Sequence, residues 1–140
     1  MAVQWTTNLA VGIDKIDDQH KEIFRRLNEF IVSMERGEGR EYINKMLTFL
    51  QDYINAHFGT EEGFMSEYNY DEKSFSNHKQ EHVKFSQTFT ALKKRFEEQG
   101  ATLFLGIGIQ QQVNDWLLNH IAKEDKKFGI YLRKSGKTQK

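Results

Sequence analysis

The organisation of this chain is clearest in the stretch His78-Lys79-Gln80-Glu81-His82-Val83-Lys84-Phe85. His78 and His82 are four residues apart, so on a helix both imidazoles point to the same side. The positions that continue this side are apolar and alternate in spacing between four and three, as in a helix packed in a bundle. They are Phe85, Phe89, Leu92 and Phe96. Two polar rings therefore lie on a helix face that should turn toward a core, where each ring needs a partner.

Composition favours one domain built from long helices. The 140 residues suffice for one core, so residues 1–140 are expected to form a single domain. The chain has no Pro, which permits long helices, and eleven Phe, which can fill a core. It has no Cys, which excludes disulfides and thiolate-bound metals. Any metal would therefore depend on imidazole and carboxylate ligands.

Charge and hydropathy argue against several classes of partner. Basic and acidic residues balance at 20 each, which disfavours a nucleic-acid role. Residues 1–14 lack a basic region followed by an apolar run, so no signal peptide is expected, and no apolar run is long enough for membrane insertion. A cytoplasmic protein is therefore expected, and the lack of a large exposed apolar face favours a monomer.

Two segments before this stretch repeat its helical period. The first, from Ile16 to Met34, should end at Gly37-Glu38-Gly39, with Asp14 or Asp17 as its N-cap. The second should run from about Glu41 to about Tyr68. The third helix then follows a turn at residues 69–71 and ends at Gly100, with Asp71 or Ser74 as its N-cap.

The fourth helix is less regular in sequence than the others. Its first residues, Leu103 to Ile109, include Gly106 and Gly108 and have poor helix propensity, and the sequence offers no role for these glycines. The helical period recovers from Ile109 to His120. Gly129 is expected to break the helix.

These segments predict an all-α fold, an antiparallel up-down-up-down four-helix bundle. Short connections make sequential helices antiparallel neighbours, and no segment alternates with the period of two that a strand requires. Residues 1–13 are expected to form an N-terminal arm, and residues 133–140 a flexible tail.

All five histidines fall on the inward faces of these helices. A single core histidine can be satisfied by a neighbour, but five of five on inward faces favour a shared metal site. In an up-down-up-down bundle, the helix ends that carry them meet at one end of the molecule, so the rings can converge. The histidines are His20, His57, His78, His82 and His120.

Carboxylates accompany two of these histidines. Glu61 follows His57 by four residues and shares its helix face. After His120, spacing favours Glu124 at four residues over Asp125 at five, because position five lies about 140° around an ideal helix. A helix that loosens at its end could still turn Asp125 inward, so spacing does not decide which of the two carboxylates belongs to the site.

The number of candidate ligands describes a dinuclear centre. Five imidazoles are too many for one tetrahedral zinc ion. Together with two bridging carboxylates and a solvent-derived bridge, they fill all but one position around two octahedral ions. Nitrogen-rich ligation without thiolates suits iron. A vacant position in a core lined by Phe and Leu suits a small neutral ligand better than an ion.

Four motifs along the chain are specific as a set, although each alone is weak. They are Trp5 with Val11-Gly12-Ile13-Asp14-Lys15-Ile16-Asp17-Asp18-Gln19-His20, His57-Phe58 with Glu61-Glu62, His78-Lys79-x-x-His82, and Asp115-Trp116-Leu117-Leu118-Asn119-His120-Ile121 followed by Asp125. With these motifs the sequence resembles the bacterial haemerythrins (bacteriohaemerythrins), single-domain non-haem di-iron proteins that bind O₂ reversibly. The resemblance covers nearly the whole chain.

The resemblance implies two iron ions per chain, joined by an oxo or hydroxo bridge. It assigns three nitrogen ligands to the coordinatively full iron, namely His78, His82 and His120. It assigns two to the iron whose open position takes O₂, namely His20 and His57. The bridging carboxylates would be Glu61 and Asp125, so the resemblance selects Asp125 over Glu124.

The resemblance also implies a binding protein rather than an enzyme. O₂ would be its small-molecule ligand, for oxygen transport, storage or delivery, and the sequence identifies no protein partner. Whether O₂ is delivered, stored or sensed stays open, because these roles would share one set of ligands. The walls of the O₂ pocket would include Trp116, Leu117 and Ile121.

Other functions fit parts of the pattern. The run His78 to His82 also matches the H-x-x-E-H of an inverted zinc peptidase, in which Glu81 would activate water. That hypothesis leaves three histidines unexplained, and Glu81 should point away from the inward face. A ferritin-like oxidase needs Glu-x-x-His pairs, and only Asp17-x-x-His20 comes close. A peroxidase-type or iron-handling bundle would share the same ligands, whereas a metal-free structural bundle would be indifferent to iron removal.

Overall fold

The structure is a computed structural model that describes residues 4–100 and 102–135, and it is all-α as predicted. No strand occurs in this part of the chain. The long helices are α1 (Asp14–Glu35), α2 (Arg40–Glu67), α3 (Glu72–Gln99) and α4 (Leu103–His120). The shorter elements are the 3₁₀ helix η1 (Thr7–Leu9), the π-helical segment η2 (Ile121–Asp125) and α5 (Lys126–Lys134).

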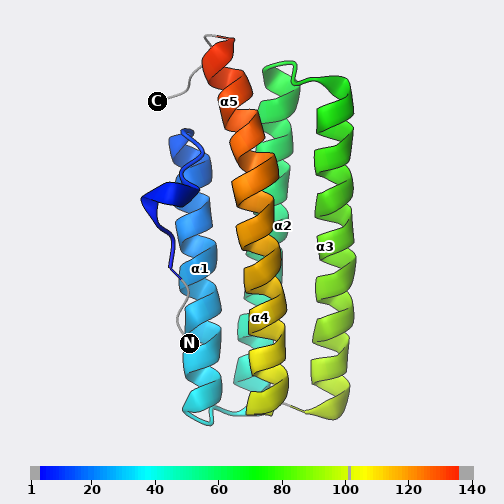
Figure 1. Ribbon diagram of the computed structural model, residues 1–140. Helices are drawn as coiled ribbons and strands as arrows, with labels where there is room; N and C mark the ends of the chain where they lie inside the picture. Colours follow the sequence, from blue (N-terminus) through cyan, green and yellow to red (C-terminus); the bar gives the residue numbers. More distant parts are fainter. Residues whose placement is uncertain (1–3, 101, 136–140) are drawn as a thin grey trace.

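The four long helices form the predicted up-down-up-down bundle (Figure 1). Each packs against its neighbour in sequence, and α1 also packs against α4, which closes the ring of four. The interior is filled by buried Phe, Leu and Ile side chains from every helix. The arrangement brings the start of α1, the end of α2, the start of α3 and the end of α4 to the same half of the molecule (Figure 1).

The N-terminal arm is fastened to the bundle by Asp17. Neither predicted N-cap is correct for α1, because Ile13 occupies the cap position and no side chain caps the helix. The Asp17 carboxylate instead accepts hydrogen bonds from Val11 N at 2.8 Å and Gly12 N at 3.3 Å. This residue therefore holds the arm where it covers the core, while residues 1–3 of the predicted arm lie outside the described residues.

The other helix ends agree better with the sequence. Asp71 caps α3 as predicted, because its carboxylate accepts from Ser74 N at 3.0 Å. Gly100 ends the same helix with a φ of 99°, a backbone conformation that suits glycine. The segment Leu103–Ile109 is helical in spite of its glycines. A Cβ at Gly106 would lie 2.7 Å from Met34 Cε, so this glycine leaves room for the Met34 side chain of α1.

The prediction that Gly129 breaks the last helix is wrong. The rod of α4 continues through η2 into α5 and ends at Lys134 (Figure 1). A Cβ at position 129 would lie 2.2 Å from Val11 O, so the glycine is needed where the arm crosses α5. Of the predicted tail, Arg133 and Lys134 are helical, and residues 136–140 lie outside the described residues. None of the described helices is long and apolar enough to cross a membrane.

Candidate metal centre

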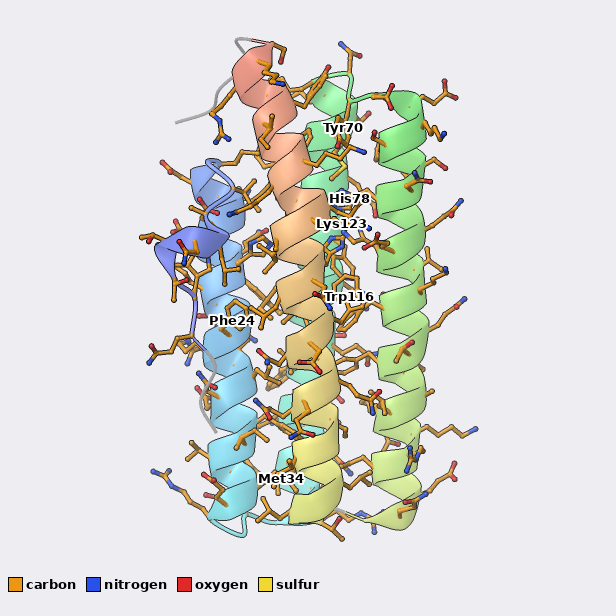
Figure 2. All side chains as sticks on the ribbon, in the orientation of Figure 1. Phe24, Met34, Tyr70, His78, Trp116 and Lys123 are labelled. Atoms are coloured by element: carbon orange, nitrogen blue, oxygen red, sulfur yellow. The ribbon has the colours of Figure 1, made fainter. Side chains whose placement is uncertain are left out.

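The seven side chains that the family resemblance assigned as ligands gather at one place inside the bundle. Every helix of the four contributes, and none of the seven residues is more than 3% exposed. In Figure 2 the labelled His78 lies inside the bundle, above Trp116 in this view. The members of the cluster are His20 from α1, His57 and Glu61 from α2, His78 and His82 from α3, His120 from α4, and Asp125 from η2.

Glu61 divides its two oxygens between two groups of histidines. Its Oε2 lies 3.5 Å from His20 Nε2 and 3.4 Å from His57 Nε2. Its Oε1 lies 3.5 Å from His78 Nε2 and 3.1 Å from His82 Nε2. The carboxylate therefore stands between a two-histidine group (His20 and His57) and a second group that contains His78 and His82.

Asp125 makes the same division from the opposite helix. Its Oδ2 lies 3.0 Å from His20 Nε2. Its Oδ1 lies 2.9 Å from His78 Nε2 and 3.1 Å from His120 Nε2. The three-histidine group is thus His78, His82 and His120. Potential ligand atoms fall into two sets that share both carboxylates, one with three imidazoles and one with two.

The π-helical segment explains why Asp125, and not Glu124, belongs to the cluster. In a π-helix hydrogen bonds run from residue i to i+5, so each turn takes in more residues than an α-turn. Residues 121–125 adopt this conformation directly after His120, and the side chain five positions on returns to its face. Glu124 is also buried, at 8% exposure, but it is outside both sets of potential ligands.

Three of the histidines have a hydrogen-bond partner on the ring nitrogen that faces away from the cluster. His57 Nδ1 lies 2.7 Å from Gln19 Oε1, and His82 Nδ1 lies 2.8 Å from Glu62 Oε2. His120 Nδ1 lies 2.9 Å from Glu81 Oε1. Sequence reasoning missed these partners, because each lies on a different helix from its histidine and spacing along one helix cannot reveal them.

Aromatic rings cover the three-histidine group. Phe58 stacks on His82, with ring centroids 3.9 Å apart, and Trp116 stacks on His120 at 4.4 Å. Phe85 lies against Trp116, with centroids 4.3 Å apart. These rings limit the access of water to the buried nitrogens from this side. Leu117 and Ile121 are buried and Trp116 is half-buried, and the role of all three predicted wall residues in an O₂ pocket stays a prediction.

Nearby carboxylates raise the pKa of three imidazoles in the cluster. Burial lowers the pKa of His20 and of His78, but the Asp125 and Glu61 carboxylates outweigh it and raise both to about 9. Burial also lowers the pKa of His120, yet Asp125 and Glu81 raise it to about 10. The two buried carboxylates therefore require positive charge close by, which protons or metal ions can supply.

The same contacts lower the pKa values of the two carboxylates. Burial raises the pKa of Glu61, but His57 and the other imidazoles hold it well below its ordinary value. Burial and the Glu61 charge raise the pKa of Asp125, but His120 and His20 outweigh them and hold it below its ordinary value. Both groups are thus ionised at neutral pH, as metal ligands must be.

Unsatisfied atoms in the cluster fit a metal better than a hydrogen-bond network. Both ring nitrogens of His20 and of His78, Oε1 of Glu61 and both oxygens of Asp125 lack a hydrogen-bond partner in the described structure. The short contacts between these imidazoles and carboxylates do not have the direction that an N–H donor needs. Buried polar atoms without partners are rare in proteins, and a bound ion is one way in which such atoms are satisfied.

The pair His82 and His120 gives the same indication. Their Nε2 atoms lie 3.1 Å apart. Each ring donates its Nδ1–H to a carboxylate, since a carboxylate can only accept. Two neutral rings would therefore turn lone pairs toward each other, so the pair needs either a shared proton or a cation bound by both rings.

Comparison with known proteins agrees with the fold. The family described as the Hemerythrin HHE cation binding domain matches residues 11–130. The bacteriohemerythrin of Methylococcus capsulatus is 36% identical over 126 residues, which cover 89% of this chain and 92% of that protein. The bacteriohemerythrin of Stenotrophomonas maltophilia is 32% identical over 127 residues, or 89% and 77% of the two chains. A crystal structure of wild-type hemerythrin superimposes with a TM-score of 0.80 at 33% identity, covering 92% of this chain and 96% of the other.

Proposed function

The chain belongs to the haemerythrin HHE cation-binding family, and from that premise we propose that it holds two iron ions and binds O₂ reversibly at one of them. The observation that carries the proposal is the division of carboxylate oxygens in the buried cluster. Glu61 and Asp125 each direct one oxygen to the two-histidine group and the other to the three-histidine group. This is the geometry required of two carboxylates that bridge a pair of metal ions.

The proposed ligand sets differ in number, which leaves one ion accessible. The ion at the three-histidine group would have five protein ligands, and the ion at the two-histidine group four. If the two ions also shared an oxo or hydroxo bridge, an octahedral ion at the two-histidine group would keep one open position. When bound, the iron pair would supply both the open position for O₂ and the electrons that O₂ binding requires.

The residues around the cluster support reversible binding rather than catalysis. Deep burial of the seven proposed ligands and the aromatic cover of Phe58 and Trp116 keep water away from the site. Leu117 and Ile121 would form walls of the O₂ pocket from the α4–η2 rod. The glutamate of the alternative peptidase motif, Glu81, accepts a hydrogen bond from His120, so it is not directed to a water between His78 and His82.

The proposed role is oxygen transport, storage or delivery, with O₂ as the small-molecule ligand. A monomeric state and a cytoplasmic location are part of the same proposal. Size-exclusion chromatography with light scattering tests the oligomeric state: one chain per particle is expected.

Cycling the iron-loaded protein between nitrogen and air tests the proposed function. We expect a haem-free visible absorption band that appears with O₂ and disappears when O₂ is removed, over repeated cycles. A band that bleaches irreversibly in the first cycle would favour oxidase chemistry. Loading with a single zinc ion per chain would favour the peptidase.

A further inference from the structure

The histidines of the proposed centre differ in what they contact on the side away from the metal. Glu62 faces His82, and Glu81 faces His120, at 2.8 and 2.9 Å from the respective Nδ1. The partner of His57 is Gln19, a neutral amide, at 2.7 Å. Both outer carboxylates therefore serve the three-histidine group, whereas the outer partner in the two-histidine group carries no charge.

The contacts fix which ring nitrogen carries the proton. A carboxylate only accepts, so His82 and His120 must donate from Nδ1 and present Nε2 to the cluster. The Gln19 amide is oriented by Thr60, whose hydroxyl donates to Ala56 O and so accepts from Gln19 Nε2. Gln19 Oε1 therefore faces His57, which likewise donates from Nδ1. All three rings are held ready to bind a metal through Nε2.

A charged acceptor changes the imidazole more than a neutral one. A hydrogen bond to an ionised group is roughly twice as strong as one between neutral groups. Because it draws the Nδ1 proton away, it also makes Nε2 a more basic ligand. Glu62 and Glu81 reach their histidines from the surface, with side chains 31% and 37% exposed.

We propose that Glu62 and Glu81 are positioning residues that make the three-histidine group the stronger electron donor of the two metal positions. This inference rests on the proposed di-iron function and deepens it. The ion held there is bound more tightly, and its Fe³⁺ state is stabilised relative to Fe²⁺. The ion at the two-histidine group, where Gln19 is the neutral partner, is held more weakly. O₂ is proposed to bind to this ion.

Isosteric variants separate charge from the hydrogen bond itself. Glu62→Gln and Glu81→Gln keep an acceptor for each histidine but remove its charge. Gln19→Glu adds a charge on the opposite group. Asp115→Asn is the matched control, because it removes an exposed carboxylate from α4, the helix that carries His120. Circular dichroism verifies that each variant is folded.

Two quantities are measured on each variant: Fe²⁺ affinity by anaerobic chelator competition, and the midpoint potential of the iron-loaded protein. We expect Glu62→Gln and Glu81→Gln each to weaken the tighter Fe²⁺ site by about 10- to 100-fold, the typical effect of losing such a partner. The midpoint potential should rise, by about 59 mV for each tenfold selective loss of Fe³⁺ binding. Gln19→Glu should tighten the weaker site and lower the potential, and Asp115→Asn should change neither.

The outcomes distinguish this inference from the proposed function. If the Gln variants match Asp115→Asn in both quantities while the protein binds O₂ reversibly, the inference is overturned and the proposed function stands. If O₂ binding is irreversible but affinity and potential shift as expected, the inference stands and the oxygen-carrier proposal fails. A wild-type protein that takes up no Fe²⁺ would overturn both.

Discussion

Single histidines in this site can carry either a proton or a metal, and pH selects between them. Folding raises the pKa of His20 and His78 from 6.5 to about 9 and that of His120 to about 10. Between pH 6.5, the ordinary pKa, and the raised pKa values of about 9 to 10, the folded protein binds more protons than the unfolded chain. The stability that these groups provide is therefore complete below about pH 6.5 and is lost as the pH rises toward 10.

The metal-free protein should accordingly become less stable from pH 6.5 to pH 10. Urea denaturation in the presence of a chelator measures the free energy of unfolding across this interval. The iron-loaded protein is the control and should lose less stability, because bound metal replaces the protons and its binding strengthens as they leave. A free energy of unfolding that is constant or rises with pH in the metal-free protein would contradict the assignment.

Leu117 tests the proposed O₂ pocket at the level of one side chain. The residue is 2% exposed, whereas its neighbour Leu118 is 36% exposed. Leu117→Ala should admit water and speed autoxidation, seen as faster loss of the oxygenated band in air. It should also cost about 2–5 kcal/mol of stability as a buried truncation. Leu118→Ala is the control, and equal autoxidation rates in the two variants would remove Leu117 from the pocket.

The sequence predicted which side chains gather better than which atoms they contact. Histidines on inward faces can be recognised from spacing alone, because an α-helix repeats its faces regularly. The outer partners Gln19, Glu62 and Glu81 could not be recognised in this way. Each contacts a histidine on another helix, so the contact depends on how the helices are rotated against each other.

At the scale of the element, the short π-helical segment is the least predictable feature. Spacing on a regular helix favours Glu124, and only the wider turn of residues 121–125 brings Asp125 to the face of His120. The charged sequence there, Lys123-Glu124-Asp125-Lys126-Lys127, contains no signal for such a turn. The choice between the two carboxylates came from family resemblance, and the geometry of η2 supplies its physical reason.

The π-helical segment predicts opposite results for two adjacent carboxylates. Asp125→Asn removes one proposed bridge, so the protein should lose at least one of its two iron ions. Glu124→Gln should keep both, because Glu124 lies outside both sets of potential ligands. Iron content after anaerobic reconstitution and desalting measures the difference. Full iron content in Asp125→Asn, or loss confined to Glu124→Gln, would show that the wrong residue has been assigned.

The contact between the arm and α5 depends on Gly129. A Cβ there would lie 2.2 Å from Val11 O, a backbone atom that cannot move without displacing the arm. Gly129→Ala should therefore destabilise the protein by about 1–3 kcal/mol, despite the better helix propensity of Ala. At Gly108, where a Cβ meets nothing within 4 Å, the same substitution should stabilise by up to about 1 kcal/mol. Urea denaturation of both variants checks the contrast, and a stabilised Gly129→Ala would mean that the arm does not pack as described.

For the molecule as a whole, topology does most to create the site. Four antiparallel helices bring segments from His20 to Asp125 to one region of the bundle, and the sequence predicted this arrangement from helix ends alone. Short connections and a continuous apolar face on each helix were sufficient for that prediction. The exact path of the arm and the extension through α5 were not predictable, because both depend on one glycine contact between segments far apart in the sequence.

The central claim is that seven buried side chains from four helices hold two iron ions. Anaerobic titration of the metal-free protein with Fe²⁺, followed by iron determination per chain after desalting, tests it most directly. We predict uptake that saturates at two iron ions per chain. Saturation at a single ion, or no retained iron, would contradict the claim.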